Sequence, residues 1–231
     1  MAGTLTWLGH AAFRIDTPGG KRVYVDPFLN GNPTCHESET EPERVDLILL
    51  THGHDDHVGD TVALYEKFKP RVIAPVELRW WLETQGVEGA SGSDPNKGGT
   101  VDADGISVTI TDANHSSSIA DRYTGEPTGL VVKLEDGYTL YFAGDTNVFG
   151  DMALIRRLYE PKLAALPIGD HYTMGPKEAA LALELLGVQR CVPCHWGTFG
   201  LLTGTPDALR ELAPAGVEIV DVEPGGSIEL T

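Results

Sequence analysis

The feature that most constrains this chain is a group of four potential metal ligands within six residues, directly after an apolar run. The run covers residues 45–50, and the sequence behind it reads Thr51-His52-Gly53-His54-Asp55-Asp56-His57. A short apolar run bounded by polar residues is typical of a buried strand. The His-x-His-x-Asp-His spacing is too specific for a solvated polar turn, so we interpret the segment as a metal-binding loop at a strand end.

The residue types in this loop predict two metal ions rather than one. Imidazole nitrogens and carboxylate oxygens are the ligands that suit borderline divalent ions such as Zn²⁺. Four such side chains in six residues cannot all face one ion. We expect His52 and His54 to point one way from an extended loop, and Asp56 and His57 to point the other way.

Both ions need further ligands, which the ends of other strands are expected to supply. Three candidates each follow an apolar, strand-like segment, and they are His115, Asp145 and His195. Taken singly, each has the ordinary reading of a hydrogen-bonded histidine or a turn aspartate. Taken together, in a chain that already has a metal-binding loop, they favour metal ligation.

Hydrophobic periodicity predicts strands and helices that interleave along the whole chain. Strands are expected at 4–8, 12–16, 23–26, 45–50, 72–74, 106–111, 130–134, 138–143, 163–167, 188–193, 217–220 and 227–230. Helices are expected at 61–68, 76–84, 151–159, 176–186 and 206–212. Thr205 before Pro206 marks one helix start, and Pro176 and Gly187 bound another helix.

The polar, glycine-rich stretch 86–99 is the best internal boundary. We interpret it as a joint between two halves, each of which contributes one sheet flanked by helices. This predicts an α/β (α+β) fold, a four-layer αβ/βα sandwich with the two sheets packed face to face. Residues 1–231 are expected to form a single domain, because compact sandwiches of this length are common as one unit.

Composition narrows the partners and the compartment. The net charge of −17, from 17 basic and 34 acidic residues, repels polyanions, and no basic cluster offsets it. We therefore expect a small-molecule substrate and no binding to nucleic acid or membrane. A homo-oligomer is left open. Residues 1–13 carry no export leader, and three cysteines, an odd number, fit a reducing compartment. We expect a cytoplasmic protein.

The segment Cys191-Val192-Pro193-Cys194-His195 matches the C-x-x-C-H pattern of c-type haem attachment. Attachment of this kind belongs to exported proteins, and no export signal is visible, so we reject it. Two cysteines three residues apart on a strand point to opposite faces. There they are expected to pack as small hydrophobic side chains.

Seven segments with specific sequences are spread over nearly the whole chain. They are 7–11 (WLGHA), 25–28 (VDPF), 51–60 (THGHDDHVGD), 143–146 (AGDT), 166–170 (LPIGD), 173–176 (TMGP) and 194–199 (CHWGTF). With these segments the chain resembles the metallo-β-lactamase superfamily. Within it, the chain is similar to the metal-dependent hydrolases related to L-ascorbate-6-phosphate lactonase.

The resemblance implies the metallo-β-lactamase sandwich and assigns the ligands to two ions. The ligands of the first ion would be His52, His54 and His115. The ligands of the second ion would be Asp56, His57 and His195. Asp145 would bridge both ions, and Asp26, at a strand end, would accept a hydrogen bond from a ligand imidazole and fix its tautomer. His10, beside Trp7 and Phe13, is expected to be a buried structural histidine.

The expected reaction is hydrolysis of a small, anionic ester, lactone or phosphodiester by a hydroxide that two divalent ions generate. Zn²⁺ is the expected ion, with Mn²⁺, Ni²⁺ or iron as alternatives. Asp56 and Asp145 would orient the hydroxide, and His171 or Tyr172 would donate to the developing oxyanion. Two other functions stay open, a mononuclear iron oxidoreductase of the persulfide dioxygenase type and a non-catalytic metal-binding protein.

Overall fold

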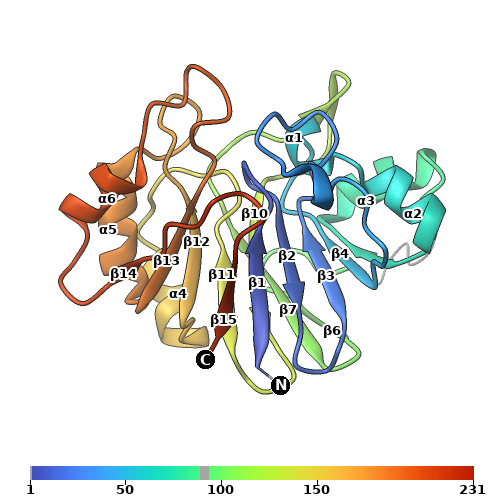
Figure 1. Ribbon diagram of the computed structural model, residues 1–231. Coiled ribbons are helices and arrows are strands. Elements are labelled where there is room, and N and C mark those ends of the chain that lie inside the picture. Colours follow the sequence, from blue (N-terminus) through green and yellow to red (C-terminus); the bar gives the residue numbers. More distant parts are fainter. Residues whose placement is uncertain (1, 89–93) are drawn as a thin grey trace.

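Two β-sheets pack face to face, and helices cover the outer face of each sheet (Figure 1). The computed structural model describes residues 2–88 and 94–231. Each sheet has two apolar faces to remove from water, one against the other sheet and one beneath helices, which is the physical reason for four layers. The expected four-layer α/β sandwich is confirmed.

The first sheet has the strand order β15-β1-β2-β3-β4-β5. Pairing is antiparallel from β15 to β3 and parallel from β3 to β5. Its strands are β1 (Gly3–Trp7), β2 (Phe13–Asp16), β3 (Arg22–Val25), β4 (Leu47–Leu49), β5 (Arg71–Ile73) and β15 (Ser227–Leu230).

The second sheet has the strand order β14-β13-β12-β11-β10-β7-β6. Pairing is parallel from β14 to β11 and antiparallel from β11 to β6. Its strands are β6 (Thr100–Ala103), β7 (Ile106–Asp112), β10 (Thr128–Lys133), β11 (Thr139–Phe142), β12 (Leu163–Pro167), β13 (Arg190–Cys194) and β14 (Glu218–Ile219). A separate small hairpin consists of β8 (Ser118–Ile119) and β9 (Arg122–Tyr123).

Helices from the two halves of the chain cover different sheets. On the first sheet lie α2 (Thr61–Phe68) and α3 (Val76–Thr84), whose Leu64 and Leu78 pack with Ile48 of β4. On the second lie α4 (Met152–Tyr159), α5 (Pro176–Leu186) and α6 (Pro206–Leu212). Two short helices, a 3₁₀ turn at Glu37–Glu39 and α1 (Asp55–Val58), lie in loops.

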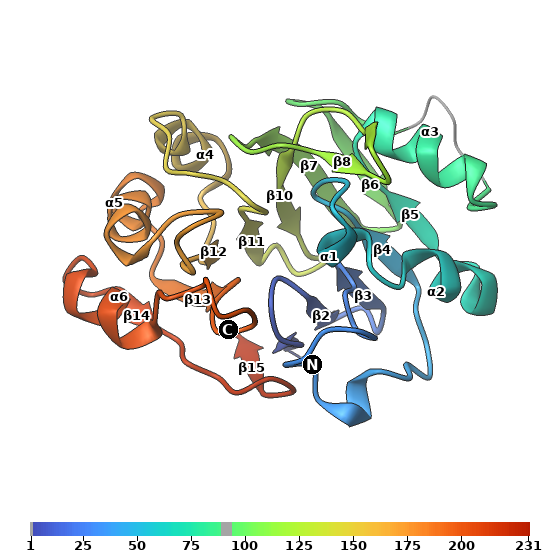
Figure 2. The same ribbon diagram turned by 90° about the horizontal axis from the view of Figure 1, so that it is seen from above.

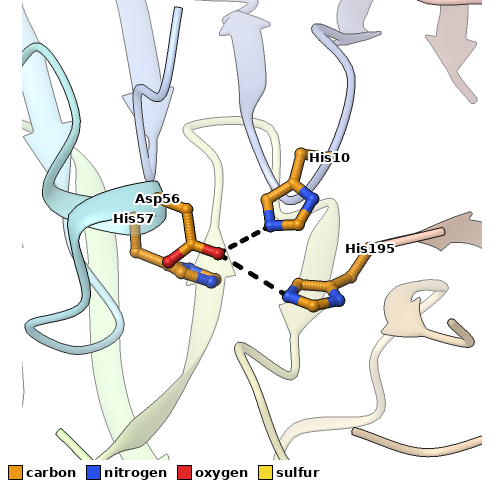
Figure 3. A group of neighbouring side chains, drawn as sticks. All are labelled: His10, Asp56, His57 and His195. Atoms are coloured by element: carbon orange, nitrogen blue, oxygen red, sulfur yellow. Dashed lines mark hydrogen bonds and ion pairs between the residues drawn. The ribbon is translucent and has the colours of Figure 1, made fainter. Parts of the chain in front are cut away.

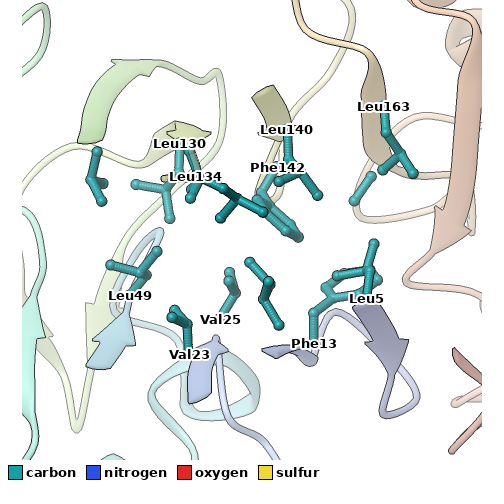
Figure 4. Packing of buried hydrophobic residues seen from close by; sticks show 14 of the residues in the cluster. Leu5, Phe13, Val23, Val25, Leu49, Leu130, Leu134, Leu140, Phe142 and Leu163 are labelled. Carbon is teal, nitrogen blue, oxygen red and sulfur yellow. The ribbon is translucent and has the colours of Figure 1, made fainter. Parts of the chain in front are cut away.

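The main hydrophobic core lies between the two sheets (Figure 4). Strand β2 shows the alternation behind it, because Phe13 and Ile15 are buried while Arg14 between them is partly exposed. Strand β12 is buried on both faces, with Leu163 in the core between the sheets and Leu166 in the core under the helices. A strand covered on both faces has a continuous apolar sequence instead of an alternating one.

Most predicted elements lie within two or three residues of their predicted bounds, and four helices lie at them. The predicted caps are also present, since the Thr205 side chain accepts from the Ala208 amide and Gly187 is left-handed at φ 59°. The prediction missed β6, the β8–β9 hairpin and α1. Strand β6 is largely exposed with little apolar patterning, and the other three are four residues or shorter.

The stretch 86–99 separates strands of the two sheets with one exception. Strands β1 to β5 precede it and β6 to β14 follow it, but the last strand, β15, returns to the first sheet beside β1. This pairing makes β15, rather than β1, the edge strand of the first sheet. Residues 89–93 of the stretch lie outside the described residues, and the interpretation of 1–231 as one domain stays a prediction.

The two cysteines of β13 point to opposite faces, as expected. Cys194 lies in the core between the sheets, whereas Cys191 lies in the core under the helices. Burial raises the pKa of the Cys191 thiol to about 12 and that of Cys194 well above its ordinary value. Both side chains therefore pack as small apolar groups rather than as thiolates.

No helix in the described part of the chain has the length and apolar character needed to cross a bilayer.

Replacement of a core leucine tests how strongly the two sheets depend on their shared core. Leu140 is fully buried between the sheets, so Leu140→Ala should lower the free energy of unfolding by about 2–5 kcal/mol. Leu158, 69% exposed, is the matched control, and Leu158→Ala should change it by less than about 0.5 kcal/mol. Urea unfolding followed by circular dichroism measures both. Equal losses would contradict the assignment of the core.

Candidate metal centre

Ends of strands from both sheets meet at one edge of the sandwich, which Figure 2 shows from above. The loop after β4 carries His52 and His54, and α1 carries Asp56 and His57. The other predicted ligands also follow strands, with His115 after β7, Asp145 after β11 and His195 after β13. The structure thus brings all seven predicted ligands to this edge in overlapping groups.

Two glycines let the ligand loops approach their neighbours. A Cβ atom at Gly53, between His52 and His54, would lie 2.0 Å from Thr124 Oγ1. Gly144, before Asp145, has φ 62°, and a Cβ there would lie 2.7 Å from a backbone oxygen. The two loops that carry these predicted ligands therefore need glycine at these positions for steric reasons.

Three histidines form the first group of potential ligands. One ring nitrogen from each of His52, His54 and His115 lies within 4.8 Å of the others. His52 Nε2 lies 3.0 Å from His54 Nδ1, and the rings of His54 and His115 are 5.2 Å apart between centroids. Three imidazoles so close together match the ligand number of one zinc ion that keeps an open position.

Asp145 faces both groups of histidines. Its Oδ1 lies 3.3 Å from His57 Nε2, and its Oδ2 lies 3.1 Å from His195 Nε2 and 3.6 Å from His115 Nε2. Two ligand atoms bound 2.0–2.1 Å from a tetrahedral ion lie about 3.3 Å apart. These separations are therefore compatible with ions held between Asp145 and the histidines on either side.

A second group of potential ligands consists of His10, Asp56, His57 and His195 (Figure 3). Asp56 Oδ2 lies 4.0 Å from His195 Nε2 and 2.9 Å from His10 Nε2. His10 is buried, as expected from the sequence, but it also contacts a predicted ligand. The signal in the sequence was its place in a Gly-His turn at a strand end, the position shared by the other ligands.

Asp26 is buried behind the metal-binding loop and accepts three hydrogen bonds. Its donors are the Thr51 amide at 2.8 Å, the Thr51 hydroxyl at 2.6 Å and His57 Nδ1 at 2.8 Å. Because a carboxylate only accepts, the proton lies on Nδ1. Nε2, the other ring nitrogen of His57, faces Asp145, so the hydrogen bond to Asp26 fixes the orientation of the ring, as expected.

The pKa shifts favour neutral imidazoles at three of the histidines and an ionised carboxylate at Asp145. Burial lowers the pKa of His52 well below its ordinary value and also lowers that of His54 and His115. Burial opposes ionisation of Asp145, but the neighbouring His195 and His57 outweigh it and hold its pKa well below the ordinary range. Lone pairs and negative charge are both what a bound cation requires.

His57 has the opposite shift. Its burial lowers the pKa, but the carboxylates of Asp145 and Asp26 outweigh burial and raise it well above the ordinary value. The two carboxylates therefore favour a positive charge at this fully buried imidazole. A divalent cation bound to Nε2 would supply that charge without a second proton on the ring.

Buried polar atoms without partners support a fit between these residues and metal ions. His57 Nε2, Asp145 Oδ1 and His195 Nδ1 are buried and have no hydrogen-bond partner of acceptable geometry in the structure. Such atoms cost free energy unless they are paired. Two of them, His57 Nε2 and Asp145 Oδ1, face each other and belong to the donor set that suits borderline divalent ions.

A cavity of about 350 Å³ opens onto this cluster. Its lining residues are His54, Asp56, His115, Ser116, Asp145, Tyr172, His195 and Phe199. Tyr172 is therefore in the wall, whereas His171 is not among the lining residues. The exposed His171 instead donates its backbone N–H to Asp170 Oδ1 at 2.7 Å. The catalytic role expected for His171 stays a prediction.

Comparison with known proteins places the chain in a family. The model described as Beta-lactamase superfamily domain matches residues 21–196. A UPF0173 metal-dependent hydrolase of Koribacter versatilis (strain Ellin345) is 46% identical over 222 residues, covering 94% of this chain and 93% of that protein. Another, from Herpetosiphon aurantiacus, is 47% identical over 230 residues, covering 96% and 95%.

A solved structure is also similar over nearly its whole length. Igni18, described as a novel metallo hydrolase from the hyperthermophilic archaeon Ignicoccus hospitalis, has 32% sequence identity and a TM-score of 0.86, covering 99% of this chain and 98% of that one. The chain therefore belongs to the metal-dependent hydrolases of the β-lactamase superfamily. The narrower relation to L-ascorbate-6-phosphate lactonase stays a prediction.

Replacement of Asp145 tests whether one carboxylate serves two ions. Protein isolated without chelator should contain two divalent ions per chain, and Asp145→Asn should lower the content of both, because the amide lacks the charge that both ions share. Plasma mass spectrometry measures metal per chain. Asp151→Asn, at an exposed position whose side chain makes no cap hydrogen bond, is the control and should keep full content. Unchanged metal in Asp145→Asn would exclude the bridge.

Proposed function

We propose that the enzyme hydrolyses a small ester, lactone or phosphodiester at a centre of two divalent ions. The observation that carries the proposal is the position of Asp145, whose two oxygens face different histidines. The first ion is assigned to His52, His54 and His115. The second is assigned to Asp56, His57 and His195, with Asp145 between the two ions.

Divalent ions bound there would supply a nucleophile from water at neutral pH and polarise the electrophile. The protein side chains would position the attacking water and accept its hydrogen bonds. Asp56 and Asp145 line the cavity as carboxylates with lowered pKa values, although burial opposes this, so they can accept hydrogen bonds from the attacking water. We favour Zn²⁺ because histidines dominate the donor set, and Mn²⁺, Ni²⁺ or iron remain alternatives.

The size and walls of the cavity support a compact substrate. A volume of about 350 Å³ is at the small end of ligand pockets. Tyr172 and Phe199 supply aromatic surface, and no Lys or Arg is among the lining residues. The metal ions would therefore have to compensate the negative charge of the anionic substrate that the sequence predicts. The net charge of −17 also disfavours a polynucleotide.

The other expectations from the sequence enter as parts of this proposal. The three free cysteines, two of them buried, support a cytoplasmic location. Membership in a family of hydrolases favours hydrolysis over the iron oxidoreductase and over a non-catalytic metal-binding protein. A visible or electron paramagnetic resonance spectrum typical of iron, in protein as isolated, would favour the oxidoreductase instead.

A panel of small substrates tests the proposed reaction. Zinc-loaded enzyme should hydrolyse at least one of para-nitrophenyl acetate, γ-butyrolactone and bis(para-nitrophenyl) phosphate, because the centre activates water for any of these electrophiles. A chelator should abolish turnover and Zn²⁺ should restore it. Asp56→Asn should lower kcat/KM by more than about 100-fold. Inactivity on all three, or faster and salt-sensitive cleavage of RNA, would contradict the proposal.

Two neighbouring residues test which side chain donates to the reacting group. We expect Tyr172→Phe to lower kcat by about 100-fold, because Tyr172 is in the cavity wall and proton transfer contributes at least this factor. His171→Gln is the matched control and should change kcat less than about threefold. Steady-state kinetics on the best substrate decide between them. The reverse pattern would restore His171 as the donor.

A further inference from the structure

His10 lies in the turn between β1 and β2, and it reaches the metal-binding loop across a long stretch of sequence. Its Nε2 lies 2.9 Å from Asp56 Oδ2, and its Nδ1 lies 3.0 Å from Thr198 Oγ1 (Figure 3 shows the Asp56 contact). The His10 ring is fully buried. Both ring nitrogens therefore have a partner: Nε2 contacts a candidate ligand, and Nδ1 contacts the loop after β13.

The direction of the hydrogen bond follows from the groups involved. A carboxylate accepts but does not donate, so the proton between His10 and Asp56 belongs to Nε2. Nδ1 faces a hydroxyl, which can donate or accept. Thr198 thus supports the ring on its far side while Nε2–H holds one oxygen of Asp56.

The separation between His10 Nε2 and Asp56 Oδ2 is that of a direct hydrogen bond. Asp145 lies 3.1 to 3.6 Å from its three histidines, near the roughly 3.3 Å that an intervening tetrahedral ion sets. The 2.9 Å between His10 and Asp56 is an ordinary hydrogen-bond length. His10 therefore contacts the candidate ligand directly through a hydrogen bond.

The backbone holds His10 in an unusual conformation. Its φ is 53°, in the left-handed region that few residues other than glycine adopt. Its carbonyl accepts from the His195 amide and from Trp7 Nε1, both at 2.9 Å. Trp7 in turn stacks on Trp196, with ring centroids 5.6 Å apart. Several contacts thus fix a strained turn whose side chain points at Asp56, a pattern that is frequent at functional sites.

We propose that His10 is a positioning residue that fixes the Asp56 carboxylate for the second metal ion, with Thr198 holding the His10 ring. The proposal rests on the proposed metal centre, in which Asp56 is a ligand. His10 acts through Asp56 rather than on the metal. Hydrogen bonds that orient a ligand typically contribute 10- to 100-fold to metal affinity.

Two substitutions of His10 test whether a donor at the position of Nε2 is what holds Asp56. The His10→Gln amide can place a donor near the position of Nε2, whereas the shorter His10→Asn amide reaches only the position of Nδ1. Asparagine tolerates φ near 53°, so His10→Asn leaves the backbone with little strain. We expect one of two Zn²⁺ affinities to fall 10- to 100-fold in His10→Asn and to recover at least tenfold of that loss in His10→Gln. Competition with a fluorescent chelator measures both affinities.

A double-mutant cycle with Asp56 tests whether His10 affects zinc binding through Asp56. In the Asp56→Ala background, His10→Asn should change zinc affinity less than about twofold, because no carboxylate is left to orient. Thr198→Val should lower the same affinity, and Thr198→Ser, which keeps the hydroxyl, should not. Circular dichroism and thermal unfolding of each metal-free variant establish that the comparison is between folded proteins.

The outcomes separate this inference from the proposed function. A single zinc site in the wild-type protein would contradict the dinuclear centre but would leave the cycle to report on the ion that Asp56 holds. Unchanged affinity in His10→Asn, equal losses in His10→Asn and His10→Gln, or the full loss in the Asp56→Ala background would each overturn the positioning role. So would a wild-type affinity retained in Asp56→Ala itself, because Asp56 would then bind no metal.

Discussion

The burial of the Asp145 carboxylate is the constraint on which the rest of the site depends. A charge removed from water costs several kcal/mol unless an opposite charge and hydrogen bonds compensate for it. Here the neighbours are imidazoles, and one carboxylate oxygen and two imidazole nitrogens stay without a hydrogen bond. Cations bound in the centre would compensate the Asp145 oxygen and His57 Nε2, which face each other. Metal binding would then contribute to the stability of the fold as well as to the chemistry, because the unfolded chain holds no such site.

Both sheets contribute to this centre, so the core between them sets its dimensions. The first sheet supplies the loop after β4, the β1–β2 turn and Asp26, while the second supplies His115, Asp145 and His195. Any shift of one sheet against the other would change the distance between ligands that belong to the same ion. The close packing of the core between the sheets, with Phe13 against Phe142 at 5.4 Å between ring centroids, resists such a shift.

The sequence predicted those parts of the structure that depend on local patterns. Helix α5 is read from Pro176, an apolar stripe and Gly187, all within a dozen residues. The four predicted ligands of the metal-binding loop stand within six residues, and the other three follow apolar strands. The link from His10 escaped prediction because its partners lie 46 and 188 residues away, a separation that no local pattern encodes. Which of His171 and Tyr172 enters the cavity was equally hidden, because adjacent turn residues differ only in direction.

Backbone conformation explains why the site residues are harder to predict than the core. His10, Asp26 and His195 all have positive φ values, between 46° and 53°, and each lies just beyond the end of a strand. A continued strand would send their side chains alternately to the two faces of the sheet, into the hydrophobic cores. At Asp26 and His195 the left-handed residue directly follows the strand and ends the extended run, whereas His10 follows Gly9 in the turn after β1. Residues other than glycine rarely adopt this conformation, so local propensity does not predict the turns at this edge of the sheets. The packed sheets stabilise these turns.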